Sequence, residues 1–234
     1  MIRFNDIPFS PKMSQALSKL KINYVFQSIF YPDGKTIYAR EALMRPMDKT
    51  VTDLITEYTL KNNLHTIEVA TIFGATIAYF DRGYKELLSV NSFPCEVCTP
   101  EEIKAYIDYF GDKKSAMIIE TLEYPEFIPE VSILKRKHIS INNNFLAIDD
   151  FGAGINTSEI VHFLKPHIIK IDRSLLSRID IDEQKQSNCA NIISSAHNCG
   201  VKIVAEGIET EGEFNCMKQL GSDFFQGYYL GMPV

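Results

Sequence analysis

Residues 145–154 read FLAIDDFGAG, an apolar run that ends in two adjacent carboxylates and a glycine-rich turn. An apolar strand that delivers acids at its carboxyl end is how α/β enzymes build their sites. Because neighbouring carboxylates repel each other, Asp149 and Asp150 favour a divalent cation between them. The same residues also suit a turn or a helix cap with a purely structural role. This stretch alone leaves both interpretations open.

Composition and charge narrow the class of protein. With 234 residues, 45% of them hydrophobic, the chain can bury a full core, and we predict one domain over residues 1–234, opening with an N-terminal extension over 1–21. The net charge of −6 and the lack of a long basic run exclude a nucleic-acid duplex as partner. No signal peptide or long apolar run occurs, so we expect a cytoplasmic protein that does not enter the membrane.

Hydrophobic periodicity predicts eight strands separated mostly by helices. The strands are expected over 22–30, 36–44, 86–91, 115–119, 144–149, 168–172, 201–205 and 223–226. The helices are expected over 14–20, 51–62, 66–82, 100–110, 126–139, 158–164, 183–199 and 211–220. This alternation predicts an α/β fold, a TIM-like (β/α)8 barrel. The opening hairpin makes one strand antiparallel, so the barrel is a modified one.

Polar side chains recur where the predicted strands end. They are Glu41, Asn91, Glu120, Asp149, Asp150, Lys170, Glu206 and Gln226. In a barrel these ends converge on one mouth. Bringing so many like charges together there costs free energy unless a ligand compensates them, so a purely structural role is not expected. Carboxylate and amide oxygens, without thiolate or imidazole, select Mg²⁺ or Mn²⁺ over zinc or copper.

Seven short motifs contain these residues and follow one another in order between Tyr24 and Pro233. They are Glu41-Ala42-Leu43-Met44-Arg45, Ser89-Val90-Asn91, Glu120-Thr121-Leu122-Glu123, residues 147–154 (AIDDFGAG), residues 169–173 (IKIDR), residues 204–210 (VAEGIET) and Gln226-Gly227-Tyr228-Tyr229. Together they resemble the EAL domain family, the cyclic di-GMP phosphodiesterases. The resemblance implies a TIM-like barrel with an antiparallel strand, in agreement with the strand count.

The resemblance also implies a role for each matching residue. Two Mg²⁺ or Mn²⁺ ions would hydrolyse one phosphodiester of cyclic di-GMP, which gives linear pGpG. One ion would be held by Glu41, Asn91, Glu120 and Asp149, and the second by Asp149 and Asp150 with Glu206 on or near it. Lys170 would contact the nucleophilic water, Glu123 would tether the loop after the fifth strand, and Gln27, Arg45 and Gln226 would contact substrate.

Some positions depart from the pattern of the family. Ser28, Leu122 and His167 replace the usual Pro, Thr and Asp, and residues 92–95 (SFPC) replace the usual Leu-Ser. Loss of the Thr hydroxyl at Leu122 would loosen the loop after the fifth strand. The alternative function is a catalytically silent receptor for cyclic di-GMP or for a protein, but no metal-binding residue is missing. Family members often dimerise beside that loop, and we expect a homodimer here.

Overall fold

Eight strands close into a barrel in the order of the chain in the computed structural model, which describes residues 1–111, 116–152 and 158–234, without the side chains of 158 and 159. The strands are β1 (Ile22–Phe30), β2 (Ile37–Pro46), β3 (Leu87–Ser92), β4 (Met117–Thr121), β5 (Phe145–Phe151), β6 (Ile168–Ile171), β7 (Lys202–Ala205) and β8 (Phe224–Phe225). The predicted modified TIM-like barrel is confirmed.

Strand β1 is the antiparallel member of the barrel. It pairs antiparallel with both β2 and β8, and Gln27 lies opposite Glu41 in the β1–β2 register. The pairs from β2–β3 round to β7–β8 are all parallel. The carboxyl ends of seven strands therefore meet at one end of the barrel, which is where α/β barrels place their functional residues.

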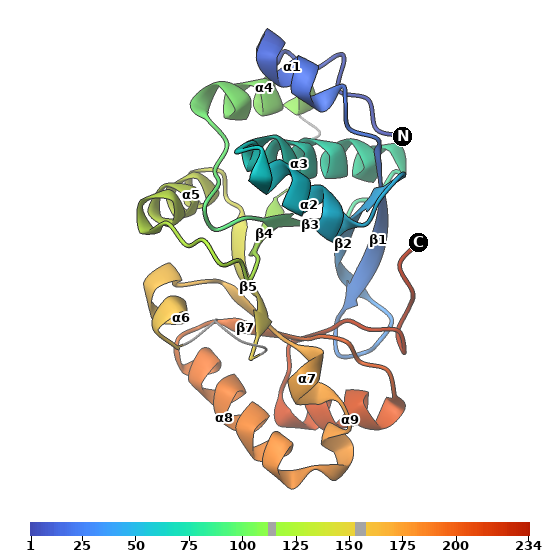
Figure 1. The fold of residues 1–234 in the computed structure, drawn as a ribbon. Coiled ribbons are helices and arrows are strands. Elements are labelled where there is room, and N and C mark those ends of the chain that lie inside the picture. Colours follow the sequence, from blue (N-terminus) through green and yellow to red (C-terminus); the bar gives the residue numbers. More distant parts are fainter. Residues whose placement is uncertain (112–115, 153–157) are drawn as a thin grey trace.

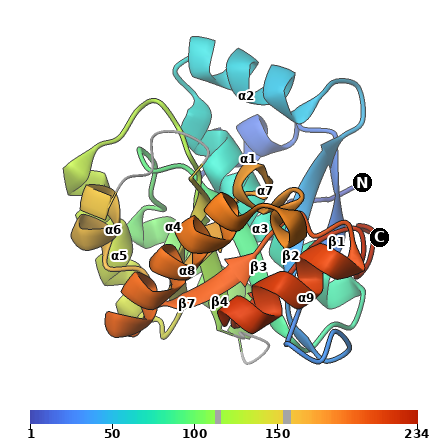
Figure 2. The same cartoon turned by 90° about the horizontal axis from the view of Figure 1, so that it is seen from below.

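Helices surround the barrel on both sides (Figure 1). They are α1 (Pro11–Leu17), α2 (Val51–Leu60), α3 (Leu64–Asp81), α4 (Pro100–Phe110), α5 (Pro129–Ile141), α6 (Ser158–Leu164), α7 (Arg173–Leu176), the 3-10 helix η2 (Ile179–Ile181), α8 (Glu183–Asn198) and α9 (Glu211–Leu220). Figure 2 shows α8 and α9 side by side next to β7, while α3 packs on β3.

Most helix boundaries follow from capping residues in the sequence. Helix α4 begins after Thr99, which forms a capping box with Glu102, and α9 ends at Gly221 in the left-handed conformation. Helix α1 begins at Pro11, three residues earlier than predicted, because the Ser10 side chain accepts a hydrogen bond from Met13 N. The four-residue helix α7 was not predicted, because so short a segment carries no helical period.

Among the residues that the structure describes, buried apolar side chains form three clusters. One lies inside the barrel and includes Ile118, Ala147 and Ile168. The other two lie between the barrel and its helices, one around α3 and the other around α8 and α9. The N-terminal helix α1 packs on α3, and the ring of Phe9, just before α1, lies 4.6 Å from the ring of Phe73 on α3. Within the described ranges, no helix is long and apolar enough to cross a membrane.

Candidate active site

The candidate site is a polar layer inside the barrel, next to the apolar layer. Side chains on a strand alternate between its two faces, so a residue two positions after an inward-facing apolar residue also points inward. The apolar residue and its polar successor are Ala39 and Glu41, Ile118 and Glu120, Ala147 and Asp149, Ile168 and Lys170, Val204 and Glu206, and Phe224 and Gln226. In antiparallel β1 the order reverses, and Gln27 precedes Ile29.

Lys170 lies at the centre of this layer, with only 2% of its side chain exposed. Its Nζ atom is 2.5 Å from Glu120 Oε2 and 2.9 Å from Asp149 Oδ1. The same atom is 2.7 Å from Glu206 Oε1 and 3.6 Å from Glu41 Oε2. Burial alone would lower the pKa of Lys170, but the surrounding carboxylates, Asp149 foremost, raise it well above its ordinary value. The charged ammonium form of Lys170 is therefore favoured while these carboxylates are ionised.

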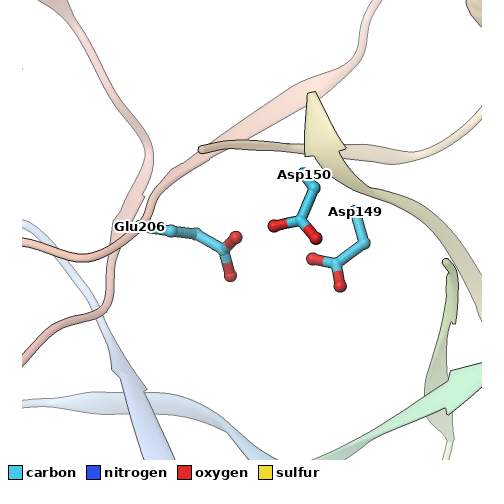
Figure 3. A group of neighbouring side chains, drawn as sticks. All are labelled: Asp149, Asp150 and Glu206. Carbon is cyan, nitrogen blue, oxygen red and sulfur yellow. The ribbon is translucent and has the colours of Figure 1, made fainter. Parts of the chain in front are cut away.

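A bulge at the end of β5 brings both aspartates into the site. Between Ile148 and Phe151 the pairing with β6 shifts register, and Asp150 has a φ of +51°. Because of this irregularity, Asp150 does not turn away from its neighbour as a regular strand residue would. Oxygens of Asp149, Asp150 and Glu206 all lie within 4.8 Å of one another, and the three side chains point toward a common space (Figure 3).

The buried carboxyl groups hold protons more tightly than carboxyl groups in water. Burial and then repulsion by Glu41 raise the pKa of Glu120 from 4.5 to about 8, although Lys170 opposes the rise. Burial raises the pKa of Glu206 well above its ordinary value. Burial and the charge of Asp149 raise the pKa of Asp150 from 3.8 to about 6. A divalent cation would displace these protons and compensate the charge that remains.

Amide side chains complete the layer. Asn91 Nδ2 donates to Glu41 Oε1 at 3.2 Å, and Gln226 Nε2 donates to Glu41 Oε2 at 2.6 Å. Gln27 Nε2 donates to the Gly231 carbonyl oxygen at 3.1 Å. In the part of the chain that the structure describes, Asn91 Oδ1 is buried without a hydrogen-bond partner. A buried acceptor without a partner costs free energy, and a cation would satisfy it.

The donor set fits divalent cations. Five carboxylates face one ammonium group, which leaves four negative charges when all are ionised. Two divalent cations carry the same amount of positive charge. All the available ligands are hard oxygens, including the buried Asn91 Oδ1, as Mg²⁺ and Mn²⁺ prefer. Residues that the sequence places on separate strands thus form one layer whose oxygen atoms suit divalent cations.

A cavity of about 320 Å³ opens above this layer. Gln27, Gln226 and most of the acids line it. So do Asp172, Arg173, Glu209 and Tyr228, to which the sequence assigns no role. All four lie two or three positions after Lys170, Glu206 or Gln226, inside the same motifs, and that proximity was the signal for them. Arg173 donates to Glu209 Oε2 at 2.6 Å and so joins two of the rim loops.

Four predicted site residues are not part of the cavity lining. Asn91 and Glu120 belong to the polar layer beneath it, whereas Arg45 and Glu123 lie outside that layer. Arg45 is exposed near the end of β2, and its Nη1 donates to the adjacent Met44 carbonyl oxygen at 3.0 Å. Glu123 lies close enough to Asp150 to contribute to its raised pKa. The loop that Glu123 is predicted to tether includes residues 153–157, which lie outside the described residues. The roles of Arg45 and Glu123 stay predictions.

Comparison with known proteins decides the family. The profile described as EAL domain matches residues 11–233. The chain belongs to the EAL domain family. It is 37% identical over 130 residues to the cyclic di-GMP phosphodiesterase PdeL of Escherichia coli (strain K12), an alignment that covers 55% of this chain and 36% of that protein. The chain spans about a third of the length of the curated relatives PdeG and PdeL.

Solved structures of other EAL proteins share the fold. One is a standalone versatile EAL protein from Vibrio cholerae O395 in its c-di-GMP bound form, with a TM-score of 0.81, 24% identity, and coverage of 92% of this chain and 93% of that one. Another is the manganese/cy-diGMP complex of Klebsiella pneumoniae BlrP1, with a TM-score of 0.77, 23% identity, and coverage of 92% and 56%. At these identities the likeness concerns the fold alone.

One departure from the usual EAL motifs has a local explanation. His167, which replaces the usual Asp before β6, accepts a hydrogen bond from Leu146 N at its Nδ1 atom, 3.0 Å away. An aspartate oxygen could accept the same bond. The substitution therefore preserves an acceptor at the junction between β5 and β6 of this EAL domain, away from the polar layer.

Proposed function

We propose that this EAL domain hydrolyses cyclic di-GMP to linear pGpG with two divalent cations, Mg²⁺ or Mn²⁺. The observation that carries the proposal is the ring of carboxylates around buried Lys170, beneath a cavity at the mouth of the barrel. The name of the relative PdeL and the manganese/cy-diGMP complex of BlrP1 support the choice of substrate and metal.

The ligands fall into two overlapping sets. Glu41, Asn91, Glu120 and Asp149 would hold one cation, and the grouping of Asp149, Asp150 and Glu206 suits the second. When bound, such a pair of cations activates a water molecule and compensates charge on the phosphate oxygens. Asp149 is assigned to both sets because its carboxylate groups with those of Asp150 and Glu206 and also shares the Lys170 ammonium with Glu41 and Glu120.

Lys170 is the fixed positive charge of the site. Lys170 lines the cavity, and because its side chain is buried, little solvent would compete with a bound phosphate for the ammonium. The ammonium can orient the attacking water and stabilise charge that develops at the phosphate. Because four carboxylates hold it from different strands, its position is fixed before substrate arrives.

The amides and Arg45 supply substrate contacts. Gln27 and Gln226 line the cavity, and their amide groups can pair with guanine edges or phosphate oxygens. Arg45 is exposed near the end of β2, and its guanidinium can bind the second phosphate of the dinucleotide in a bidentate manner. Because the site itself is acidic, we expect tight binding of this anionic substrate only when divalent cations are present.

Product analysis tests the proposal. The protein is incubated with cyclic di-GMP and MgCl₂ or MnCl₂, with an EDTA control, and the nucleotides are separated by chromatography. Metal-dependent appearance of pGpG is the expected result. If cyclic di-GMP stays intact in both MgCl₂ and MnCl₂ while calorimetry still detects its binding, the protein would instead be a silent receptor. The expected homodimer is a separate proposal, which light scattering of the purified protein checks.

A further inference from the structure

A buried ion pair outside the barrel supports the strand that carries Asn91. Glu68 on α3 and Lys135 on α5 expose only 1% and 7% of their side chains, and Lys135 Nζ lies 3.4 Å from Glu68 Oε1. Neither residue lines the active-site cavity. Two charges buried this deeply require a reason, since a buried pair rarely adds stability compared with apolar residues of the same size.

Both charged groups bind the end of β3. Glu68 Oε1 accepts a hydrogen bond from Ser92 Oγ at 2.5 Å, and Glu68 Oε2 accepts one from Phe93 N at 3.0 Å. Lys135 Nζ donates to Ser92 Oγ at 2.6 Å and to the Phe93 carbonyl oxygen. The pair therefore satisfies the backbone groups of Phe93 where the strand ladder stops.

Strand alternation connects this pair to the site. Asn91 points into the barrel, and Ser92, the next residue, points outward to α3 and α5. Holding Ser92 and Phe93 therefore fixes the direction of the Asn91 side chain on the opposite face. In this orientation Asn91 Nδ2 donates to Glu41 Oε1. Asn91 Oδ1 has no hydrogen-bond partner among the described residues, so it is available to a metal ion.

The ion pair also accounts for an unusual stretch of sequence. Residues 92–95 (SFPC) replace the Leu-Ser that usually follows the asparagine. Ser92 supplies the hydroxyl that both charged groups use, and Ser132 Oγ of α5 donates to the Pro94 carbonyl oxygen at 3.2 Å. These contacts hold residues 92–94 against α3 and α5.

We propose that Glu68 and Lys135 are positioning residues for the first metal site, acting through Ser92 and Phe93 on Asn91. The inference rests on the proposed function in so far as Asn91 is taken as a metal ligand. Residues that orient a ligand from outside the coordination sphere typically change metal affinity about 10- to 100-fold when they are replaced. Glu68→Gln should weaken Mn²⁺ binding within that range.

The test is a titration of metal-free protein with MnCl₂, with free Mn²⁺ read by electron paramagnetic resonance. The variants are Glu68→Gln, Ser92→Ala and, as a matched control, Glu102→Gln. Glu102 is a buried carboxylate of α4 whose hydrogen bonds, among the described residues, are to His65 and Thr99. We expect weaker Mn²⁺ binding for Glu68→Gln, a smaller loss for Ser92→Ala, and wild-type affinity for the control.

A double-mutant cycle distinguishes positioning from a general structural role. In the Asn91→Ala background, Glu68→Gln should cause no further loss of Mn²⁺ affinity, because its effect passes through Asn91. An unchanged Mn²⁺ affinity in Glu68→Gln, or an equal loss with and without Asn91, would overturn the inference. If Glu68→Gln does not fold, Ser92→Ala decides, and its wild-type affinity would overturn the inference. Because the readout is binding, a failure to hydrolyse cyclic di-GMP does not affect the test.

Discussion

Asp149 and Asp150 are neighbours in the chain, yet their carboxylates lie on the same side of β5. Pairing with β6 skips from Ile148 to Phe151, and the positive φ of Asp150 turns its side chain back toward the site. Aspartate and asparagine tolerate this backbone conformation better than other residues with a Cβ. The sequence thus places at the bulge a residue type that suits both the backbone and the ligand set.

Replacements of Asp150 should separate these two roles. Asp150→Asn keeps the backbone preference and removes the charge, so we expect turnover of cyclic di-GMP to fall at least about 10-fold, while the melting temperature in EDTA is no lower than that of wild type. Asp150→Ala should lower turnover similarly and also lower the melting temperature, because alanine disfavours positive φ. Steady-state kinetics and calorimetry measure both effects. Equal melting temperatures for the two variants would contradict the role assigned to the bulge.

Lys170→Ala should reduce kcat more than it raises KM. The ammonium is buried among carboxylates, so its main effect is expected on charge that develops in the transition state. Lys202→Ala is the control, since Lys202 pairs with Asp223 near the amino end of its strand. Kinetics across a range of cyclic di-GMP concentrations give both parameters. An increase in KM that matches the loss of kcat would make Lys170 a ground-state phosphate contact instead.

Stabilisation by Mn²⁺ should increase with pH. The folded-state pKa values of Glu120, about 8, and Asp150, about 6, lie above their ordinary values of 4.5 and 3.8. The folded state then binds more protons, so these groups lower the stability of the metal-free protein as pH rises between about 4 and 8. Melting temperatures with EDTA and with MnCl₂ should differ more at about pH 8 than at about pH 6. A difference that does not change with pH would contradict this prediction.

His65 offers a pH test far from the site. Hydrogen bonds to Glu102 and then Glu96 raise the pKa of His65 from 6.5 to about 10. Because the folded-state pKa is the higher one, the stabilisation is full below about pH 6.5 and is lost as pH rises through about 10. His65→Gln should lower the melting temperature by about 2–4 °C at about pH 6 and by nothing above pH 10. The exposed His162→Gln is the control, and a loss of the same size at both pH values would refute the account.

The part of the fold and site that could be predicted depends on local patterns. Strand periodicity located the eight strands, and the polar residue at each strand end converges as expected because parallel strands share one direction. The capping residues Thr99 and Gly221 marked helix ends correctly, since capping involves neighbours within a few positions.

The rest depends on contacts between distant residues. The four carboxylates around Lys170 come from different strands, and no local pattern gives their distances. Glu68 and Lys135 are 67 positions apart, Glu68 on the largely buried helix α3 and Lys135 on α5, and no local pattern pairs them. The bulge at Asp150 depends on pairing with β6 and is invisible in the apolar run that precedes it.

The most direct test of the central claim compares wild type with Asp149→Asn in the cyclic di-GMP assay with MnCl₂. Asp149 is assigned to both cations, so Asp149→Asn removes the negative charge of a ligand that the two would share. Asp223→Asn is the matched control, because Asp223 makes the same kind of contacts near the opposite end of the barrel, to His197 and Lys202. We predict pGpG from wild type and from Asp223→Asn, and a rate at least about 100-fold lower from Asp149→Asn. Near-normal production of pGpG by Asp149→Asn would contradict the two-metal account.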